Sequence, residues 1–336
     1  MIVVKNIKKN FVKVIKEPGV KGSIKSLFNP KKEIVQAVNK VSFNMKEGEI
    51  IGLMGPNGAG KSTLIKILTG ILTPTDGYCN INGYIPQKDR QNYVKEIGVV
   101  FGQRTQLWWD LPLEESYSVL KEIYEVSDAD FKERMQYLND VLGLEGFIKS
   151  PVRTLSLGQR MRADIAAALL HNPKVLFLDE PTIGLDATVK KKIRQAIKEI
   201  NVKYKTTIIL TTHDLTDIEV LCKRVLIIDK GIKIFDGSIE ALKASFGRTY
   251  ELNFEVVENE SINKLNYANK FKTTKKQFKV LQKDNFVTVA FDSEEFSIHD
   301  VIQYTLECVK VQNITIKDTD IEEIIRLIYE GATINV

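Results

Sequence analysis

The segment GPNGAGKST, residues 55–63, restricts the fold of this chain more than any other segment. It satisfies the pattern G-x-x-x-x-G-K-[ST], with the apolar run EIIGLM before it and the apolar-periodic stretch Lys61–Leu68 after it. Glycines let the backbone turn so that several N–H groups converge, and a helix that begins there adds positive partial charge. The segment therefore predicts a phosphate-binding loop between a buried strand and a helix.

Within this loop the Lys61 ammonium can reach the β- and γ-phosphates of a nucleotide, and the hydroxyl of Ser62 suits Mg²⁺. By itself the loop indicates only a P-loop nucleotide-binding protein, because kinases, GTPases and ATPases share it. The residues expected to surround the phosphates are Gly55, Asn57, Gly58, Ala59, Gly60, Lys61, Ser62 and Thr63.

Two adjacent carboxylates, Asp179 and Glu180, end the apolar run VLFLD at residues 175–179. In open α/β sheets the ligand binds at the carboxyl ends of the strands, so carboxylates there lie near it. We expect Asp179 to hold Mg²⁺ and Glu180 to polarise the attacking water, the division of labour that phosphoryl transfer needs. In isolation, an acid pair before Pro181 would also fit a helix start.

The composition limits the possible partners of the chain. The 336 residues carry a net charge of +5, but lysine and acidic residues are mixed along most of the chain, so the charge does not indicate a nucleic-acid partner. Three dispersed cysteines indicate neither a disulfide framework nor a metal site. No apolar run reaches about 18 residues, so we expect a cytoplasmic protein that meets membranes only through partners.

The pattern along the chain predicts an α/β core. VLFLD and TTIIL, residues 206–210, are uninterrupted apolar or β-branched runs, typical of parallel strands covered on both faces, and helical periodicity separates them. Residues 113–147 carry helical periodicity with many charges, within a helical subdomain expected at about residues 104–170. Residues 13–36 contain several prolines, glycines and lysines, which predicts an irregular basic insertion.

A domain boundary is expected near Ser245–Arg248, giving a first domain of residues 1–245 and a small α+β domain of residues 246–336. Beyond the boundary, YELNFEVV and NITIK alternate like strands, and FKVLQKDNFVTVAF indicates two strands around Asp284-Asn285. SIHDVIQYTLECV and DIEEIIRLIY carry helical periodicity.

Four further motifs complete a series that resembles the ABC ATPase family. They are Gln103 in GQRTQLWWDLP, LSLGQR at residues 155–160, GLD at residues 184–186, and His213 after TTIILTT. Their order and spacing agree over about residues 1–240, the whole first domain. The resemblance implies a P-loop NTPase core that hydrolyses ATP with Mg²⁺, in a dimer whose second nucleotide-binding domain is expected to be another copy of the chain.

The resemblance also implies roles for single residues. Lys61, Glu180 and His213 would be catalytic; Ser62, Gln103 and Asp179 would hold the metal; and Phe11, Gln103, Ser156, Gly158, Gln159 and Asp186 would contact ATP, the signature residues in the opposite protomer. In LSLGQR, Leu157 replaces the first glycine of the common LSGGQ. From the residues alone, Ser156 suits a helix N-cap, His213 could be structural, and Phe11 could be a core residue.

A subset of the family is most similar: ATPase subunits of type-2 ABC exporters, including the daunorubicin- and viologen-resistance-like group. The basic insertion, QLWWDLP, LSLGQRMR, PTIGLD and the terminal DIEEIIRLIY carry this resemblance. It implies separate membrane permease subunits, a peripheral location on the inner face of the cell membrane, and export of small hydrophobic or cationic compounds. An importer ATPase with a C-terminal regulatory domain, or a soluble ABC ATPase, stays an alternative.

Trp108 and Trp109 are the two tryptophans of the chain and follow Gln103 closely. Neighbouring side chains cannot share one helix face, so one could be buried while the other lines a groove for a permease. Burial of both in the core is the alternative.

Overall fold

The structure is a computed structural model that describes residues 1–15, 31–102, 104–245, 249–257, 265–273, 277–293, 295–318 and 321–329. Contacts between Cα atoms divide the chain into two units, Met1–Gly237 and Ser238–Val336. These contacts group helix α9 (Ile239–Ser245) with the second unit, whereas the sequence pattern places the boundary after this helix. The apolar periodicity of a sequence shows where a helix begins and ends, but it does not show which unit the helix packs against.

A six-stranded sheet forms the centre of the first unit, in the order β5-β6-β7-β3-β8-β9. Its strands are β3 (Ile50–Met54), β5 (Ile97–Phe101), β6 (Val175–Asp179), β7 (Thr207–Thr211), β8 (Arg224–Asp229) and β9 (Ile232–Ser238). Five neighbouring strands pair in parallel, in the order β5, β6, β7, β3 and β8. The interiors of β6 and β7 are buried. The two apolar runs are thus confirmed as parallel strands covered on both faces.

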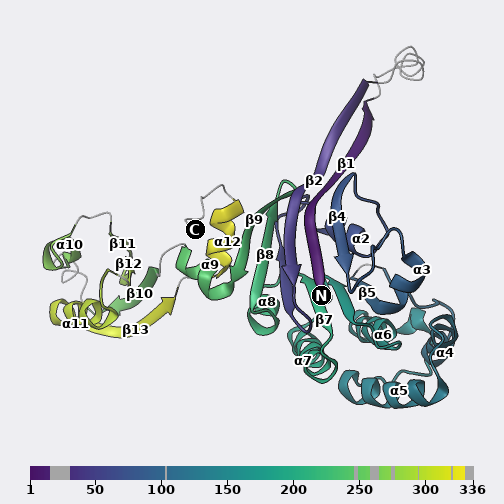
Figure 1. Cartoon of the computed structure of the whole chain (residues 1–336). Coiled ribbons are helices and arrows are strands. Elements are labelled where there is room, and N and C mark those ends of the chain that lie inside the picture. Colours follow the sequence, from purple (N-terminus) through teal and green to yellow (C-terminus); the bar gives the residue numbers. More distant parts are fainter. Residues whose placement is uncertain are drawn as a thin grey trace, which may run out of the picture. The chain divides into compact units, whose positions relative to one another are not determined.

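Helices lie around this sheet (Figure 1), which confirms the α/β class. They are α2 (Lys61–Leu68), α3 (Arg90–Tyr93), α6 (Leu157–Leu169), α7 (Ala187–Tyr204) and α8 (Leu215–Leu221). α4 (Leu113–Ile123) and α5 (Asp128–Leu142) pack against α6 within residues 104–170, where a helical subdomain is expected, and short 3₁₀ turns cover Val94–Glu96 and Val152–Thr154. Of the helices that the structure describes, none has the length and apolarity needed to cross a bilayer.

A second sheet in the same unit is antiparallel, in the order β2-β1-β4. It consists of β1 (Ile2–Ile15), β2 (Lys31–Met45) and β4 (Asp76–Ile81), and β1 and β2 extend as a long ribbon (Figure 1). The prediction of an irregular segment at 13–36 is therefore wrong at 13–15 and 31–36; residues 16–30 lie outside the described part. The pairing of Val12 with Ile34 and Lys13 with Glu33 continues the ladder there, and a single sequence does not show such long-range partners.

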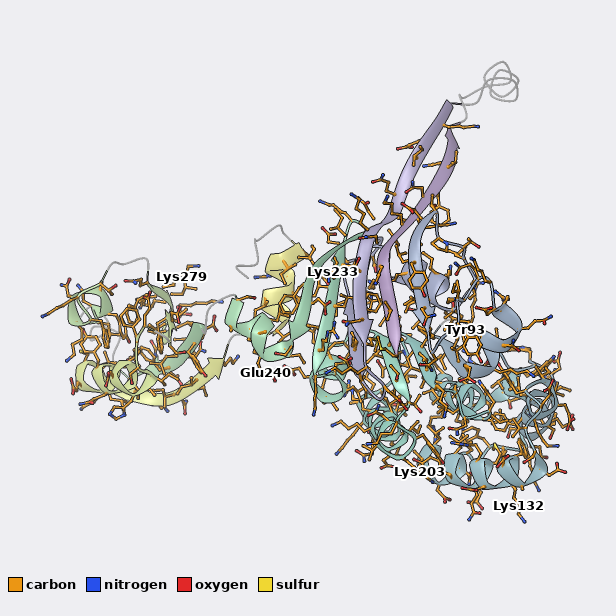
Figure 2. All side chains as sticks on the ribbon, viewed as in Figure 1. Tyr93, Lys132, Lys203, Lys233, Glu240 and Lys279 are labelled. Carbon is orange, nitrogen blue, oxygen red and sulfur yellow. The ribbon has the colours of Figure 1, made fainter. Side chains whose placement is uncertain are left out.

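One apolar cluster joins the two sheets of the first unit. It contains Ile2 and Val41 from the antiparallel sheet together with Ile51 and Phe177 from the parallel sheet. Tyr93, labelled in Figure 2, belongs to the same cluster; its ring is fully buried, and its hydroxyl donates a hydrogen bond to the Leu68 carbonyl oxygen. The core thus fixes the end of α2, the helix that begins at the phosphate-binding loop.

The second unit contains a four-stranded antiparallel sheet in the order β11-β12-β10-β13. Its elements are β10 (Thr249–Val256), α10 (Tyr267–Lys270), β11 (Phe278–Lys283), β12 (Phe286–Asp292), α11 (Ile298–Cys308), β13 (Val311–Asp318) and α12 (Ile321–Tyr329). Asp284, at φ 55°, makes the turn between β11 and β12, as its sequence predicts. The α+β prediction is confirmed, and Leu252, Phe254 and Phe291 lie in its buried apolar cluster.

Candidate functional site

The phosphate-binding loop runs from β3 into α2 and turns on glycine. Gly60 has a φ of 105°, and a Cβ atom there would lie 2.3 Å from the Ala37 carbonyl oxygen, so a larger residue does not fit. The Lys61 ammonium lies inside the loop and donates to the carbonyl oxygens of Gly55 at 2.5 Å and Pro56 at 3.2 Å. A buried cation thus adjoins the free amide groups at the start of α2, an arrangement that suits phosphate.

Two carboxylates act on this lysine. Burial lowers the pKa of Lys61, while the charges of Glu180 and Asp179 raise it. These opposing effects indicate that the end of β6 lies near the phosphate-binding loop.

The pairing of β6 with β7 fixes both carboxylates. Asp179 lies opposite Thr211, whose hydroxyl donates to the Asp179 Oδ1 atom at 2.5 Å. The Glu180 amide donates to the Thr211 carbonyl oxygen at 2.9 Å, although Glu180 has a φ of 57°, which few residues other than glycine adopt. Backbone strain of this kind collects at functional sites, where the surrounding structure maintains it.

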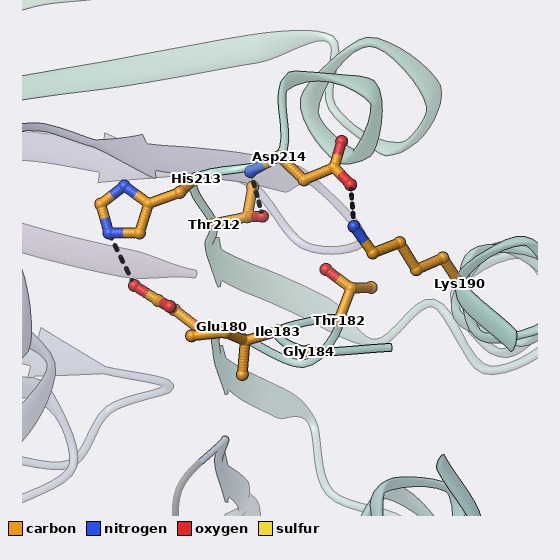
Figure 3. A pocket seen from close by; sticks show the side chains of 8 residues that line it. All are labelled: Glu180, Thr182, Ile183, Gly184, Lys190, Thr212, His213 and Asp214. Carbon is orange, nitrogen blue, oxygen red and sulfur yellow. Dashed lines mark hydrogen bonds and ion pairs between the residues drawn. The ribbon is translucent and has the colours of Figure 1, made fainter. Parts of the chain in front are cut away.

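His213 meets Glu180 at the carboxyl ends of β6 and β7 (Figure 3). Its Nε2 atom lies 2.9 Å from the Glu180 Oε1 atom, and its side chain is 49% exposed. Both residues line a cavity of about 340 Å³ together with Thr182, Gly184 and Lys190. The structure thus brings two of the three predicted catalytic residues into direct contact.

A network of buried and partly exposed charges adjoins this cavity. Asp217 is fully buried, and it accepts hydrogen bonds from Thr212, at 2.8 Å, and Thr182, at 2.5 Å, and forms an ion pair with Arg194 of α7. Lys190, one turn earlier on α7, forms an ion pair with Asp214 at 2.7 Å (Figure 3). The network connects α7 to the segments on both sides of the Glu180–His213 contact.

Gln103, predicted as a metal and ATP ligand, lies outside the described residues. The residue before it is described: the Gly102 amide donates to the Asp179 carbonyl oxygen at 2.8 Å. A Cβ atom on Gly102 would lie 2.5 Å from the Glu180 carbonyl oxygen. Gly102 therefore packs against the backbone of the two residues that carry the carboxylates.

The signature residues lie at the start of α6, and a capping box confirms Ser156 as the helix N-cap: its Oγ atom accepts from the Gln159 amide, and the Gln159 side chain accepts from the Ser156 amide. A Cβ atom on Gly158 would lie 3.0 Å from a methyl group of Val189. A Cβ atom on Gly184 would lie 3.1 Å from Leu157, so the unusual Leu157 packs beside the GLD motif of its own chain. In that motif, Asp186 caps α7 by accepting from the Val189 amide.

Phe11 lies on β1, is 40% exposed and pairs with Val35 of β2. Val35 precedes Ala37 by two residues, and the Ala37 carbonyl oxygen contacts the phosphate-binding loop at Gly60. The Lys9 ammonium lies 5.3 Å from the centre of the Phe11 ring. This exposed ring is a surface residue, so its burial in the core is excluded.

Trp108 and Trp109 are 39% and 49% exposed, which excludes burial of both in the core. The guanidinium of Arg160 lies 5.4 Å from the centre of the Trp109 ring. Trp109 and Arg160 line a cavity of about 420 Å³ between the segment after Gln103, α6 and the GLD motif.

Comparison with known proteins shows the family of this chain. The ABC transporter family profile matches residues 38–183. ABC transporter ATP-binding protein NatA of Bacillus subtilis is 32% identical over 68% of this chain and 92% of its own length. The chain is an ABC transporter ATP-binding protein. Linearmycin resistance ATP-binding protein LnrL of the same species is 35% identical over 65% of this ABC protein and 68% of its own length.

Other relatives are much longer. Cholesterol transporter ABCA5 of Rattus norvegicus is 33% identical over 72% of this ABC protein, which spans only 15% of that relative. These matches agree with the resemblance to type-2 exporters.

Solved structures agree with the P-loop ABC ATPase fold. The dimeric ADP- and phosphate-bound, post-hydrolysis structure of the cassette MJ0796 has a TM-score of 0.59, with 28% identity over 71% of this chain and 99% of that chain. CbiO1 of Clostridium perfringens has a TM-score of 0.57, with 27% identity over 70% of this chain and 88% of its own. This ABC protein is therefore an ATPase, as its motifs predict.

Sequence reasoning missed two residues that support the site, Thr211 and Asp217, and one buried carboxylate outside it, Asp164. Thr211 was visible only as part of a polar run after a strand. Met161, Asp164 and Ala168 are spaced three and four residues apart, so they share one face of α6, and this face is buried. An acidic residue among apolar residues on such a face is unusual, and this was the sequence signal for Asp164. Its burial raises the pKa of Asp164 to about 6, although hydrogen bonds from Thr105 and Gln106 and the charge of Arg160 oppose this rise.

The ion pairs of α7 predict an unequal effect of two matched substitutions. Arg194→Leu should lower the free energy of unfolding by about 3 kcal/mol, because it leaves the Asp217 charge buried without its cation. Lys190→Leu should lower it by less than about 1 kcal/mol, because Asp214 stays partly exposed to water. Urea unfolding measures both, and equal losses would contradict this account of the network.

The raised pKa of Asp164 predicts a pH-dependent stability. The folded chain binds a proton at this carboxyl more tightly than the unfolded chain does, so the contribution of Asp164 to stability falls as pH rises from about 4 to about 7. The free energy of unfolding of the wild type minus that of Asp164→Asn should fall over this window by roughly 2 kcal/mol. Denaturant titrations at several pH values measure this difference, in which other groups cancel; a difference that stayed flat or rose would refute the assignment.

Proposed function

We propose that this chain is the ATP-hydrolysing motor subunit of an ABC exporter for small hydrophobic or cationic compounds. The observation that carries the proposal is the contact of Glu180 with His213 beside the carboxylate of Asp179, close to the buried ammonium of Lys61. These groups supply a base, a metal-binding carboxylate and two phosphate ligands at one edge of the sheet. Resistance to linearmycin, in the name of LnrL, favours export.

The complete ATP site is proposed to form between two copies of the chain. Ser156, Gly158 and Gln159 begin α6, and the N-terminus of a helix attracts anions. In the proposed dimer this helix start faces the γ-phosphate bound at the loop of the other copy, with Asp186 nearby. The dimeric cassette MJ0796, which is similar in fold, supports such an assembly.

In the proposed mechanism the chain positions groups around ATP and stabilises charge. Lys61 and the amides of residues 55–63 hold the β- and γ-phosphates, and Phe11 stacks on the adenine. Glu180 orients and polarises the attacking water, and His213 donates a hydrogen bond to the γ-phosphate.

Hard oxygen donors such as the Ser62 hydroxyl and the Asp179 carboxylate fit Mg²⁺, with Gln103 as a further ligand. When bound, Mg²⁺ neutralises the charge that develops on the phosphate oxygens.

Membrane permease subunits are the proposed partners, and the chain then works at the inner face of the cell membrane. Trp108 and Trp109 support this proposal, because large exposed aromatic side chains often anchor partners. An importer ATPase is the second candidate. It is favoured by the C-terminal α+β unit, which suits a regulatory domain.

Glu180→Gln should bind ATP normally but hydrolyse it at least about 100-fold more slowly, because an amide cannot accept the proton of the attacking water. ATP should then trap a closed dimer, which size-exclusion chromatography and an ATPase assay detect. Glu219→Gln, an exposed substitution on α8, is the matched control and should behave like the wild type. Turnover of Glu180→Gln at the wild-type rate would rule out Glu180 as the base.

Trp108→Ala and Trp109→Ala should reduce co-purification of the permease from membranes while ATP affinity changes less than about twofold, because neither ring belongs to the proposed ATP contacts. Tyr78→Ala, on β4 and 45% exposed, controls for the loss of an exposed aromatic ring. Identification of the co-purified subunits also decides between an exporter, an importer and a soluble ATPase. Full retention of the permease by both tryptophan variants would contradict the proposed contact.

A further inference from the structure

A buried carboxylate lies in the middle of the signature helix and is not part of the ATP site described above. Asp164 is 5% exposed, and its neighbours Ala163, Ile165 and Ala166 are fully buried. Aspartate is a poor helix former, and a buried charge lowers stability unless partners compensate it. An apolar residue at this position would pack α6 with a smaller loss of stability, so helix packing alone does not account for Asp164.

The partners of Asp164 come from the segment that follows Gln103. The Thr105 hydroxyl donates to the Asp164 Oδ1 atom at 2.8 Å, and the Gln106 amide donates to the same atom at 3.2 Å. The Gln106 side chain donates to the Asp164 carbonyl oxygen at 3.3 Å, and the Thr105 hydroxyl accepts from the Leu107 amide at 3.1 Å. Asp164 thus holds two consecutive residues of this segment directly, and Thr105 in turn holds the third.

The residue just before Gln103 is attached to the backbone of β6, the strand that ends in the carboxylates of the ATP site. Gly102 donates to the Asp179 carbonyl oxygen, so residues on the two sides of Gln103 in the sequence are attached to β6 and to α6. Thr105, Asp164, Leu157 and Gly102 line the same cavity of about 420 Å³. The contacts of Asp164 therefore attach Thr105 and Gln106, which follow Gln103 in the sequence, to the helix that begins with Ser156.

We propose that Asp164 is a positioning residue that couples the Gln103 segment to the signature helix, so that both move as one body when ATP binds. The inference rests on the proposed function, because it assumes that the start of α6 completes the ATP site of a second copy. Through Thr105 and Gln106, Asp164 transmits a displacement of the segment at the nucleotide to Ser156 and Gly158. Without this connection, ATP would still bind, but the signature helix would no longer follow it into the dimer.

The test compares Asp164→Ala, Thr105→Val and the control Thr105→Ser in the full chain. Thr105→Val has nearly the shape of threonine but no hydroxyl, whereas Thr105→Ser keeps the hydroxyl that donates to Asp164. For each variant we would measure the affinity of ATP, the kcat and KM of hydrolysis, and ATP-driven dimerisation in a Glu180→Gln background.

Asp164→Ala and Thr105→Val should keep the ATP affinity and KM within about twofold, lower kcat about tenfold and weaken dimerisation about tenfold, as expected for loss of one hydrogen bond to a charged group. Thr105→Ser should match the wild type. The double variant Asp164→Ala/Thr105→Val should be no worse than either single variant, because both remove the same connection.

Unchanged kcat and dimerisation in Thr105→Val would overturn the proposal, even if Asp164→Ala proves too unstable to study. Additive losses in the double variant, or an equal loss of ATP affinity, would also overturn it, because a merely structural role would produce them. If Glu180→Gln itself fails to dimerise with ATP, the proposed function fails. The kcat of Thr105→Val in the Glu180 background still decides the role of Asp164 in that case.

Discussion

Asp179 and Thr211 lie opposite each other at the carboxyl ends of two paired parallel strands, and the candidate site is arranged around this pair. The parallel register places Glu180 and His213 immediately beyond these ends, where their side chains meet. The same edge receives the phosphate-binding loop, because β3 pairs with β7 on the other side. Parallel pairing thus converts motifs that are distant in the sequence into one site at the edge of the sheet.

Polar interactions behind this edge keep the site in place at some cost to stability. Asp217 and Arg194 are charges taken out of water, and Asp164 is a carboxylate enclosed by the signature helix and the segment after Gln103. Burial of charge seldom adds to stability by itself, whereas it does select one arrangement of the groups that satisfy it. Asp217 and Asp164 each join two segments that flank a motif, so this loss of stability falls where relative position matters for ATP hydrolysis.

Local signals predicted most elements well. The apolar runs at β6 and β7, the turn at Asp284 and the cap at Ser156 all follow from residues close in sequence, and each is confirmed. The ribbon of β1 and β2 failed as a prediction, because its regularity comes from pairing between distant segments. The exposure of Phe11 and both tryptophans was also undecided, since burial depends on what else packs nearby.

The sequence by itself determined the chemistry of this protein: a phosphate-binding loop, two carboxylates after a buried strand and a histidine after the next, in the order of an ABC ATPase. The chemical groups of these residues do not depend on the fold, so residue types and their order in the sequence are enough to predict this chemistry. Only the tertiary structure decided that His213 contacts Glu180, that Asp217 supports this contact, and that Asp164 holds the segment after Gln103. Such contacts depend on strand register and helix packing, which arise from interactions between distant parts of the chain.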